Sequence, residues 1–425
     1  MFKTLLIILS ASLLYSCKTE TSKHLLPADW LSQEAVFLTY TGNPRDTATT
    51  NKVMSVCDQL IGQISPHLKM YLLVNAEWNT DSMMKVFSGK RFHTKNIELV
   101  PVYKLFDMGV VRDYGPIIVK DEDGNRKLLR FNWDYVGADF LNPDTAWQRE
   151  KDKTRDRYFT RISRLLGMEV ISNPLALEGG EIEVNGSGTA IIVDSFYRRR
   201  NPFFTDQSVD SLLHLSLGIS KVIRLREGVA EDPAPWHSRI SGNIYGTGVG
   251  GHVDEFARFV NPTTVLLAMP TSEEASNDPI KRINYERMMV NYQILSKAKD
   301  QDGKGFTIIK VPCPDVTPDN ILIDTTDNSA PGRWIRADYP ELKHGTTVGF
   351  LPAVSYLNYI ILNNLVILPR YSKPGHPASG ARKDEEVRKI FQLLFPEKTI
   401  IGMDPTGLNF VGGGFHCWTQ QVPSK

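Results

Sequence analysis

Residues 384–401, DEEVRKIFQLLFPEKTII, contain the pattern that decides the fold. Val387, Ile390, Phe391 and Leu394 recur at the three- and four-residue spacing of one helix face. A short β-rich run over 398–401 follows almost at once. The segment therefore predicts an amphipathic helix over 384–394 that leads directly into a strand.

The same alternation of an amphipathic helix and a short strand occurs four more times upstream. The predicted helices are 51–65, 155–166, 208–215 and 284–297, and the strands after them are 69–74, 168–171, 221–225 and 307–311. Further strand-like segments between the units are 116–119, 190–193, 264–268 and 359–368. The pattern indicates an α/β fold with an internal repeat of structure, although no sequence repeat is readable.

One polar cluster follows each predicted helix. In chain order, these clusters are marked by Asp113, Glu178, His252 with Asp254, Asn358 and Cys417. A closed ring of five units would bring all of them to one central cavity. Because no Pro-, Gly- or Ser-rich linker divides the chain, we expect a single catalytic domain over residues 23–425.

Length and charge exclude several classes of protein. A chain of 425 residues can bury a large core, and its formal net charge of +1 offers no global attraction for nucleic acid. The short run Arg198-Arg199-Arg200 is typical of a solvated loop. Composition therefore predicts an ordinary folded protein without a nucleic-acid partner, and leaves its oligomeric state open.

The first residues have the pattern of an export signal. Lys3 precedes an apolar stretch, 5–14, that is too short to span a bilayer, and Tyr15-Ser16-Cys17 ends it. A cysteine in that place resembles the end of a bacterial lipoprotein signal. We expect a signal peptide over 1–17, lipidation at Cys17, a polar tether over 18–22 and a membrane-anchored protein in the periplasm or at the cell surface. A plain cleaved signal peptide is the alternative.

The remaining cysteines do not form a disulfide or zinc pattern. Cys57, Cys313 and Cys417 are odd in number and no CxxC is present, so no metal ligands are predicted. Cys57 lies on the apolar face of a predicted helix, and Cys313 lies between two prolines after a strand, so both are interpreted as packing residues. Cys417 follows the glycine run 412–414, where a backbone can come close to a ligand. It is the candidate nucleophile.

The residue types in the other clusters suit chemistry on a guanidinium group. Asp113 and Asp254 could clamp this planar cation, because carboxylates accept its forked N–H donors. The Cys417 thiolate could then attack the central carbon, while His252 protonates the departing nitrogen and later activates water. Glu178 would orient His252 and stabilise its charge. A cationic substrate and an imidazolium would both favour the thiolate.

Four motifs together resemble the agmatine deiminase and Porphyromonas-type peptidylarginine deiminase family. They are Arg112-Asp113-x-Gly115-Pro116, Leu177-Glu178-Gly179-Gly180-x-Ile182-x-Val184, Gly251-His252-Val253-Asp254 and Gly413-Gly414-x-His416-Cys417-x-Thr419-Gln420-Gln421. The resemblance implies a pentein fold, a five-bladed α/β propeller of pseudo-five-fold ββαβ repeats around a central active site. It also implies hydrolysis of a guanidino group to a ureido group and ammonia, through a covalent cysteine thiouronium and without metal or organic cofactor.

The resemblance also assigns roles to individual residues. Cys417 matches the nucleophile and His252 the general acid/base, Asp113 and Asp254 match the substrate carboxylates, and Glu178 matches the acid of the LEGG motif. Residues expected to contact the substrate are Asn358, Arg112, Trp133 and Arg130. The implied substrates are agmatine, converted to N-carbamoylputrescine, and free or peptidyl arginine, converted to citrulline.

Other interpretations remain open at this point. The same residues suit an amidinotransferase of the pentein fold or another exported Cys/His/acid hydrolase. A surface lipoprotein that binds cationic ligands without turnover is a third possibility. Taken alone, His252 and Asp254 alternate along a possible strand and would share a face as a structural hydrogen-bonding pair. His416, beside the nucleophile, is interpreted as a packing or orienting residue.

Overall fold

The repeating unit of the fold is an antiparallel strand pair, a helix and a parallel third strand. In the C-terminal unit, β18 (Ile360–Ile361) pairs antiparallel with β19 (Leu365–Pro369). Helix α11 (Ala378–Leu394) then leads back to β20 (Thr399–Met403), which pairs parallel with β19. A parallel pair needs such a crossover, and the amphipathic helix supplies it while covering the sheet.

The same order of pairing recurs in three other sheets of this computed structural model. The units are β5 (Ile117–Asp121), β6 (Arg126–Arg130), α5 (Thr145–Leu166) and β7 (Glu169–Ser172); β8 (Ile182–Val184), β9 (Thr189–Val193), α6 (Asp194–Arg200), α7 (Asp206–Leu217) and β10 (Lys221–Leu225); and β13 (Ala257–Asn261), β14 (Thr264–Ala268), α8 (Ser272–Asn277), α9 (Pro279–Lys297) and β15 (Thr307–Val311). The α/β class predicted from the sequence is confirmed as a set of small mixed sheets.

The remaining unit joins the two ends of the chain. Its antiparallel pair is formed by β2 (Gln33–Thr39) and the last strand, β21 (Thr419–Pro423). Helix α1 (Thr47–Ile64) connects β2 to the parallel strand β3 (Lys69–Asn75), and α2 (Thr80–Gly89) and a 3₁₀ turn (Thr94–Asn96) lead to β4 (Ile97–Val102), parallel to β3. The strand that follows Cys417 is therefore fixed by the first large strand of the fold.

A further sheet, built from two separate insertions, stands outside this repeat. Strand β11 (His237–Ser241) pairs with β12 (Ile244–Thr247), β12 pairs with β17 (Thr347–Pro352), and β17 pairs with β16 (Asp319–Leu322). Helix α10 (Gly332–Asp338) lies between β16 and β17, and the short strand β1 (His24–Leu25) extends another sheet by pairing with β5. No sequence pattern predicted this additional sheet.

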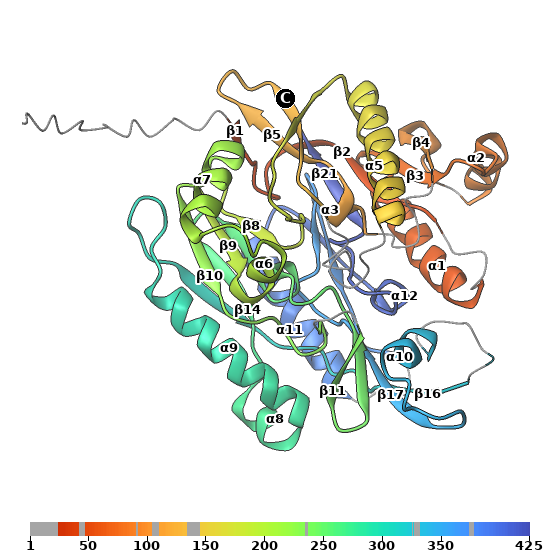
Figure 1. Cartoon of the computed structure of the whole chain (residues 1–425), viewed down its shortest axis with the longest axis vertical. Helices are drawn as coiled ribbons and strands as arrows, with labels where there is room; N and C mark the ends of the chain where they lie inside the picture. The colour runs from red at the N-terminus through yellow and green to blue at the C-terminus, as the bar shows by residue number, and fades with distance from the viewer. Residues whose placement is uncertain are drawn as a thin grey trace, which may run out of the picture.

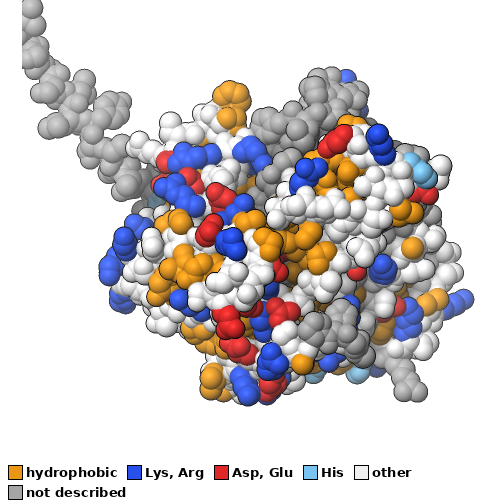
Figure 2. All heavy atoms as spheres, turned by 90° about the horizontal axis from the view of Figure 1, so that it is seen from below, with side chains coloured by type: hydrophobic (Ala, Val, Ile, Leu, Met, Phe, Trp, Pro, Cys, Tyr) orange, Lys and Arg blue, Asp and Glu red, His pale blue; other side chains and the backbone are white. Residues whose placement is uncertain are grey.

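The structure describes residues 24–41, 47–90, 92–103, 110–133, 145–233, 237–324, 326, 332–373 and 378–425. The predicted signal peptide, Cys17 and the tether lie outside these ranges. Among the helices that are described, none combines the length and apolar character needed to cross a membrane. Acidic and basic side chains are intermingled on the face drawn in Figure 2, as expected for a net charge near zero.

The five predicted helices are all present, and each begins before its predicted start. The observed helices begin two to ten residues earlier, as at α9, where Asp278 accepts hydrogen bonds from the amides of Ile280 and Lys281 and Pro279 occupies the first turn. Asp and Pro in these positions favour a helix start but lie outside the apolar repeat. Strands 221–225, 264–268 and 307–311 match their predicted bounds, whereas 359–368 is divided into β18 and β19.

The strands lie toward the middle of the molecule, and helices α1, α5, α7 and α9 lie on its outside (Figure 1). Each helix buries only its inner face, and α11 illustrates this arrangement. Val387 and Phe391 are buried against the sheet, with Tyr359 packed edge-on to Phe391, whereas Leu393 is 83% exposed. Cys57 and Cys313 are buried in the apolar clusters, as predicted.

Two substitutions in α11 test this arrangement. Phe391→Ala should lower the free energy of unfolding by about 3–5 kcal/mol, because it removes a fully buried ring and leaves a cavity. Leu393→Ala, two residues away on the exposed face, should change it by less than about 0.5 kcal/mol. Urea unfolding followed by circular dichroism measures both changes. Equal losses from the two variants would contradict the assigned orientation of the helix.

Candidate active site

The loop that carries Cys417 depends on glycine. It connects α12 (Thr406–Asn409) to β21, and Gly412 and Gly413 have φ of 90° and 103°, a region that favours glycine. A Cβ on Gly413 would lie 2.9 Å from both Cβ and Sγ of Cys417. The backbone therefore folds tightly around the cysteine, as the glycine run predicted, and the thiol is fully buried.

Asn358 holds this loop in place from the neighbouring unit. Its Oδ1 accepts hydrogen bonds from the amides of His416 at 2.9 Å and Cys417 at 3.2 Å. Its Nδ2 donates to Sγ of Cys417 at 3.1 Å and to Oε1 of Glu255 at 2.8 Å. The predicted substrate contact is thus a residue whose side chain is committed to positioning the cysteine in this structure.

His252 lies at the start of a 3₁₀ turn, Val253–Glu255, and not on a strand. The expectation that His252 and Asp254 alternate along a strand is therefore wrong. Asp232 accepts hydrogen bonds from the backbone amides of Gly251 and His252 at 2.8 and 2.9 Å, and also from those of residues 249 and 250. This buried carboxylate satisfies four consecutive amides of the Gly-rich loop and fixes a turn that periodicity cannot reveal.

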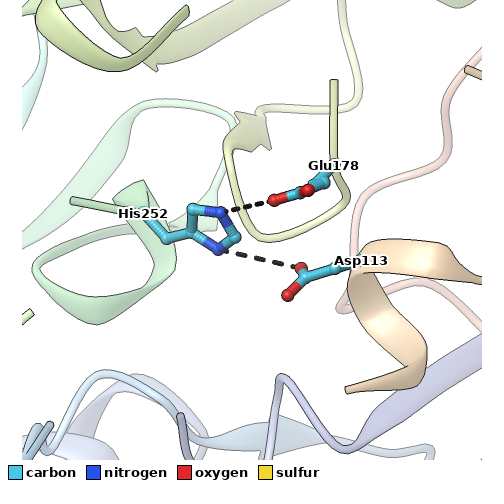
Figure 3. A group of neighbouring side chains, drawn as sticks. All are labelled: Asp113, Glu178 and His252. Carbon is cyan, nitrogen blue, oxygen red and sulfur yellow. Dashed lines mark hydrogen bonds and ion pairs between the residues drawn. The ribbon is translucent and has the colours of Figure 1, made fainter. Parts of the chain in front are cut away.

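His252 lies between two carboxylates from different units (Figure 3). Its Nε2 is 2.8 Å from Oε2 of Glu178, and its Nδ1 is 3.7 Å from Oδ1 of Asp113. Burial lowers the pKa of His252, but the charge of Asp113, the hydrogen bond with Glu178 and the charge of Asp254 together raise it to about 10. His252 is therefore an imidazolium at neutral pH, ready to donate a proton.

Glu178 is kept ionised by partners from two other segments. Arg200 donates to Oε1 at 2.9 Å and Trp133 donates its indole N–H to the same oxygen at 2.5 Å. Burial raises the pKa of Glu178, but Arg200 and His252 hold it below its usual value. The prediction of a solvated basic loop at 198–200 is correct only for the exposure of Arg198 and Arg199. The segment is the end of α6 and not a loop, and the side chain of Arg200 is fully buried between Glu178 and Glu181.

The carboxylates of Asp113 and Asp254 keep unused hydrogen-bonding capacity. Asp113 lies on the one-turn helix α3 (Val111–Tyr114); both of its carboxylate oxygens, and Oδ1 of Asp254, are buried without a hydrogen-bond partner of good geometry among the described residues. Burial and the charges of Glu178 and Asp254 raise the pKa of Asp113 well above its usual value, although His252 opposes them. An added cation with N–H donors would satisfy these oxygens.

Asp254 also contacts the cysteine directly. Its Oδ2 lies 3.5 Å from Sγ of Cys417 and 2.7 Å from Nδ1 of His416. Glu255, which no sequence argument selected, lies 3.9 Å from the same sulfur. Burial, followed by the negative charges of Asp254 and Glu255, raises the pKa of the Cys417 thiol well above its usual value. The resting cysteine is therefore a protonated thiol.

Two other predicted substrate residues are engaged in contacts of their own. Arg112 donates its backbone N–H to the carbonyl of Cys417 at 3.0 Å, and its guanidinium contacts the side chain of Gln421 and the carbonyl of His416. Arg130 forms an ion pair with Asp156 on α5. Arg112 thus holds the loop that carries the nucleophile, and Trp133 holds Glu178, whereas the described side-chain contacts of Arg130 lie with α5.

Two sets of side chains are close enough to hold a metal ion. They are Asp113, Glu178 and His252, and Asp254, Glu255 and Cys417, with ligand atoms within 4.8 Å of one another in each set. In the first set, the protonated ring of His252 has no lone pair to offer a metal ion, and Glu178 already accepts hydrogen bonds from Arg200 and Trp133. The donor set therefore fits a flat organic cation with several N–H groups better than a compact metal ion.

Comparison with known proteins agrees with this chemistry. The agmatine deiminase of Ectopseudomonas mendocina is 28% identical over 79% of this chain and 79% of its own length. That of Pseudomonas syringae pv. syringae is 26% identical over 94% of this chain and 95% of its own. The solved structure of the Enterococcus faecalis agmatine deiminase superimposes on 95% of this chain and 98% of its own chain. Its sequence is 21% identical and the TM-score is 0.69, so the fold is shared.

The family description extends over nearly all of the described fold. Residues 25–423 match the family of Porphyromonas-type peptidyl-arginine deiminases. These residues include all four motifs and every contact described around Cys417. The resemblance read from the motifs is confirmed, and with it the class of hydrolases that act on the C–N bonds of amidines. The chain belongs to the Porphyromonas-type peptidyl-arginine deiminase family.

Proposed function

We propose that this protein hydrolyses a guanidino group to a ureido group and releases ammonia. The observation that carries the proposal is the pair of buried carboxylates, Asp113 and Asp254, with unsatisfied oxygens beside the thiol of Cys417. A guanidinium is the cation whose shape and donors suit two opposed carboxylates. An acyl substrate would instead require hydrogen-bond donors aimed at an oxyanion.

The steps follow from the protonation states of the resting site. The substrate cation binds between Asp113 and Asp254, and its charge favours the thiolate of Cys417, which attacks the guanidinium carbon. The imidazolium of His252 donates a proton to the departing nitrogen, and ammonia leaves a covalent thiouronium. His252, now neutral, removes a proton from water as the water attacks the same carbon. The ureido product and the free cysteine result, and Glu178 stabilises the imidazolium at both stages.

The substrate that we propose is agmatine, converted to N-carbamoylputrescine, with free or peptidyl arginine as the other members of the class. The name of the relatives that match most of the chain supports agmatine. The family description supports peptidyl arginine. Both substrates carry the same guanidinium, so the clamp and nucleophile act identically on them and only the tail differs.

We further propose that the five ββαβ units close into a ring, the five-bladed propeller of the pentein fold. The antiparallel pairing of β2 with β21 supports this closure, because it joins the first unit to the last. Each unit then contributes to the central site, as Asp113, Glu178, His252, Asn358 and Cys417 do. The likeness to the Enterococcus faecalis structure also supports it.

The decisive measurement is product formation by the purified protein, residues 23–425. With agmatine, arginine and a peptide with C-terminal arginine offered in turn, one of them should yield ureido product and ammonia in equal amounts. Cys417→Ala should abolish both, whereas Cys313→Ala, which changes another buried free cysteine, should retain turnover. Absence of ureido product from every substrate, or turnover by Cys417→Ala, would contradict the proposal.

Gly180 provides a test that does not alter a reacting group. A Cβ there would lie 2.6 Å from Nδ1 of His252 and 3.1 Å from carboxylate oxygens of both Asp113 and Asp254. Gly180→Ala should therefore lower kcat/KM by about a hundredfold or more, because it displaces the general acid and the clamp together. Gly89→Ala, whose Cβ meets nothing within 4 Å, should leave kcat/KM unchanged. Near-normal activity of Gly180→Ala would refute this geometry.

We also propose that the protein is exported and anchored through a lipid on Cys17, as the pattern of residues 1–17 indicates. Expression of the full chain in a bacterial host should place the protein in the membrane fraction, with a lipid on the peptide that begins at Cys17. Cys17→Ser should move it out of that fraction, whereas Cys57→Ser should not. Membrane association that survives Cys17→Ser would exclude this anchor.

A further inference from the structure

The proposed reaction needs an acceptor for the thiol proton of Cys417. His252 cannot take it while it is an imidazolium, a state enforced by Asp113 and Glu178 on either side. The sulfur has another contact that could take the proton: Sγ of Cys417 lies 3.5 Å from Oδ2 of Asp254. The same oxygen is 2.7 Å from Nδ1 of His416, so the thiol, Asp254 and His416 are connected.

His416 continues this connection to the edge of the molecule. Its Nε2 lies 2.8 Å from Oδ2 of Asp29, a residue of the N-terminal segment between β1 and β2. The side chains of His416 and Asp254 are 2% and 0% exposed, whereas that of Asp29 is 20% exposed. Four side chains thus form a continuous path from the buried sulfur to a carboxylate in contact with solvent.

The two contacts of His416 leave one proton unaccounted for. Both ring nitrogens face carboxylate oxygens at hydrogen-bonding distance, but a neutral imidazole carries only one N–H. Burial and the charges of Arg112 and Arg258 lower the pKa of His416, and the carboxylates of Asp254 and Asp29 have lowered pKa values as well. In the resting triad of two carboxylates and a neutral ring, one ring nitrogen of His416 therefore faces a carboxylate oxygen without a proton between them.

The lining of a cavity beside Asp29 indicates where the path meets water. The cavity measures about 50 Å³, room for a few water molecules, and its walls include Asp29, Arg112 and His416. Three glutamines in these walls each bury an amide atom without a hydrogen-bond partner among the described residues: Oε1 of Gln33, Oε1 of Gln420 and Nε2 of Gln421. Buried polar atoms of this kind are normally satisfied by ordered water.

We infer that Asp254, His416 and Asp29 form a proton relay that accepts the thiol proton of Cys417 and connects it to water behind the active site. The inference rests on the proposed function, since it concerns the nucleophile of that reaction. The S–H bond breaks, the proton passes over Oδ2 of Asp254 to Nδ1 of His416, and an N–H bond forms. The imidazolium then donates to both carboxylates. After water has added to the thiouronium, the sulfur leaves the tetrahedral adduct and the proton returns to it from His416. The hydroxyl proton of the adduct leaves with the ammonia as ammonium, so the relay ends the cycle unchanged.

In this relay His416 and Asp29 are positioning residues that act through Asp254, since neither contacts the reacting carbon. The groups that face His416 are Asp254 from the 3₁₀ turn, Asp29 from the N-terminal segment, Arg112 from α3 and Arg258 from β13. The two arginines keep His416 neutral before the transfer, and the two carboxylates stabilise it afterwards. Its neighbours thus suit both states of the ring.

Alkylation of Cys417 by iodoacetamide tests the relay without requiring deimination. The thiolate is the species that reacts, and peptide mass spectrometry isolates Cys417 from the other cysteines. His416→Gln and Asp29→Asn should each slow alkylation at neutral pH by about tenfold or more and move its pH profile to higher pH, because one pKa unit changes the thiolate fraction tenfold. The KM for the guanidino substrate should stay within about twofold of the parent value.

Glu183→Gln is the matched control. Glu183 is buried and contacts the same Arg258 that pairs with Asp29, but it lies outside the path. Burial raises its pKa to about 8, so glutamine reproduces the protonated side chain. This variant should leave the alkylation profile unchanged. A shift as large as that of His416→Gln would show that the effect is structural and would overturn the relay.

The two proposals fail in different ways. Ureido product from the parent protein together with unmoved alkylation profiles in both His416→Gln and Asp29→Asn would overturn the relay and leave deimination intact. Shifted profiles without ureido product from any substrate would support the relay and overturn the proposed function. Asp29→Asn, at the outer end of the path, decides the outcome if His416→Gln does not fold.

Discussion

The structure depends on the way it neutralises carboxylates that have no access to water. Asp113, Glu178, Asp254 and Glu255 are each at most 3% exposed and lie around one histidine and one cysteine. Burying an ionised carboxylate costs several kcal/mol unless a partner compensates. Glu178 has Arg200 and His252, and Asp254 has His416, whereas burial and neighbouring negative charge raise the pKa values of Asp113 and Glu255. The cluster therefore contains fewer cationic groups than acidic groups, and it can accommodate one additional cation.

Much of the fold could be predicted because its information is local. The apolar repeat of α11 and the β-rich run behind it lie within a few turns of each other, and the same holds for the other four helices. Starts of helices were missed because caps such as Asp278 stand outside the apolar repeat. The sheet formed by β11, β12, β16 and β17 was missed for a different reason: its strands come from two insertions about a hundred residues apart and pair only in the folded chain.

The candidate site divides in the same way between local and long-range information. Asp113, Glu178, His252 and Cys417 each have a glycine within three residues along the chain, so short motifs were sufficient to identify them. Their partners carry no such mark. Arg200 belongs to a run of three arginines that is typical of a solvent-exposed segment, and Asp29 lies 387 residues from His416 along the chain. Whether such an arginine or aspartate is buried depends on contacts with residues far away in the sequence. A single sequence does not reveal these contacts.

The surplus of carboxylates explains why a single cation can both bind and start the reaction. Without it, negative charge around Cys417 keeps the sulfur protonated. A guanidinium held by Asp113 and Asp254 offsets part of this negative charge and favours the thiolate at the moment that the carbon to be attacked is in place. A ureido product has the same planar shape but no charge, so the clamp loses its electrostatic partner once the reaction is complete. The same buried acids that select the substrate therefore also favour release of the product.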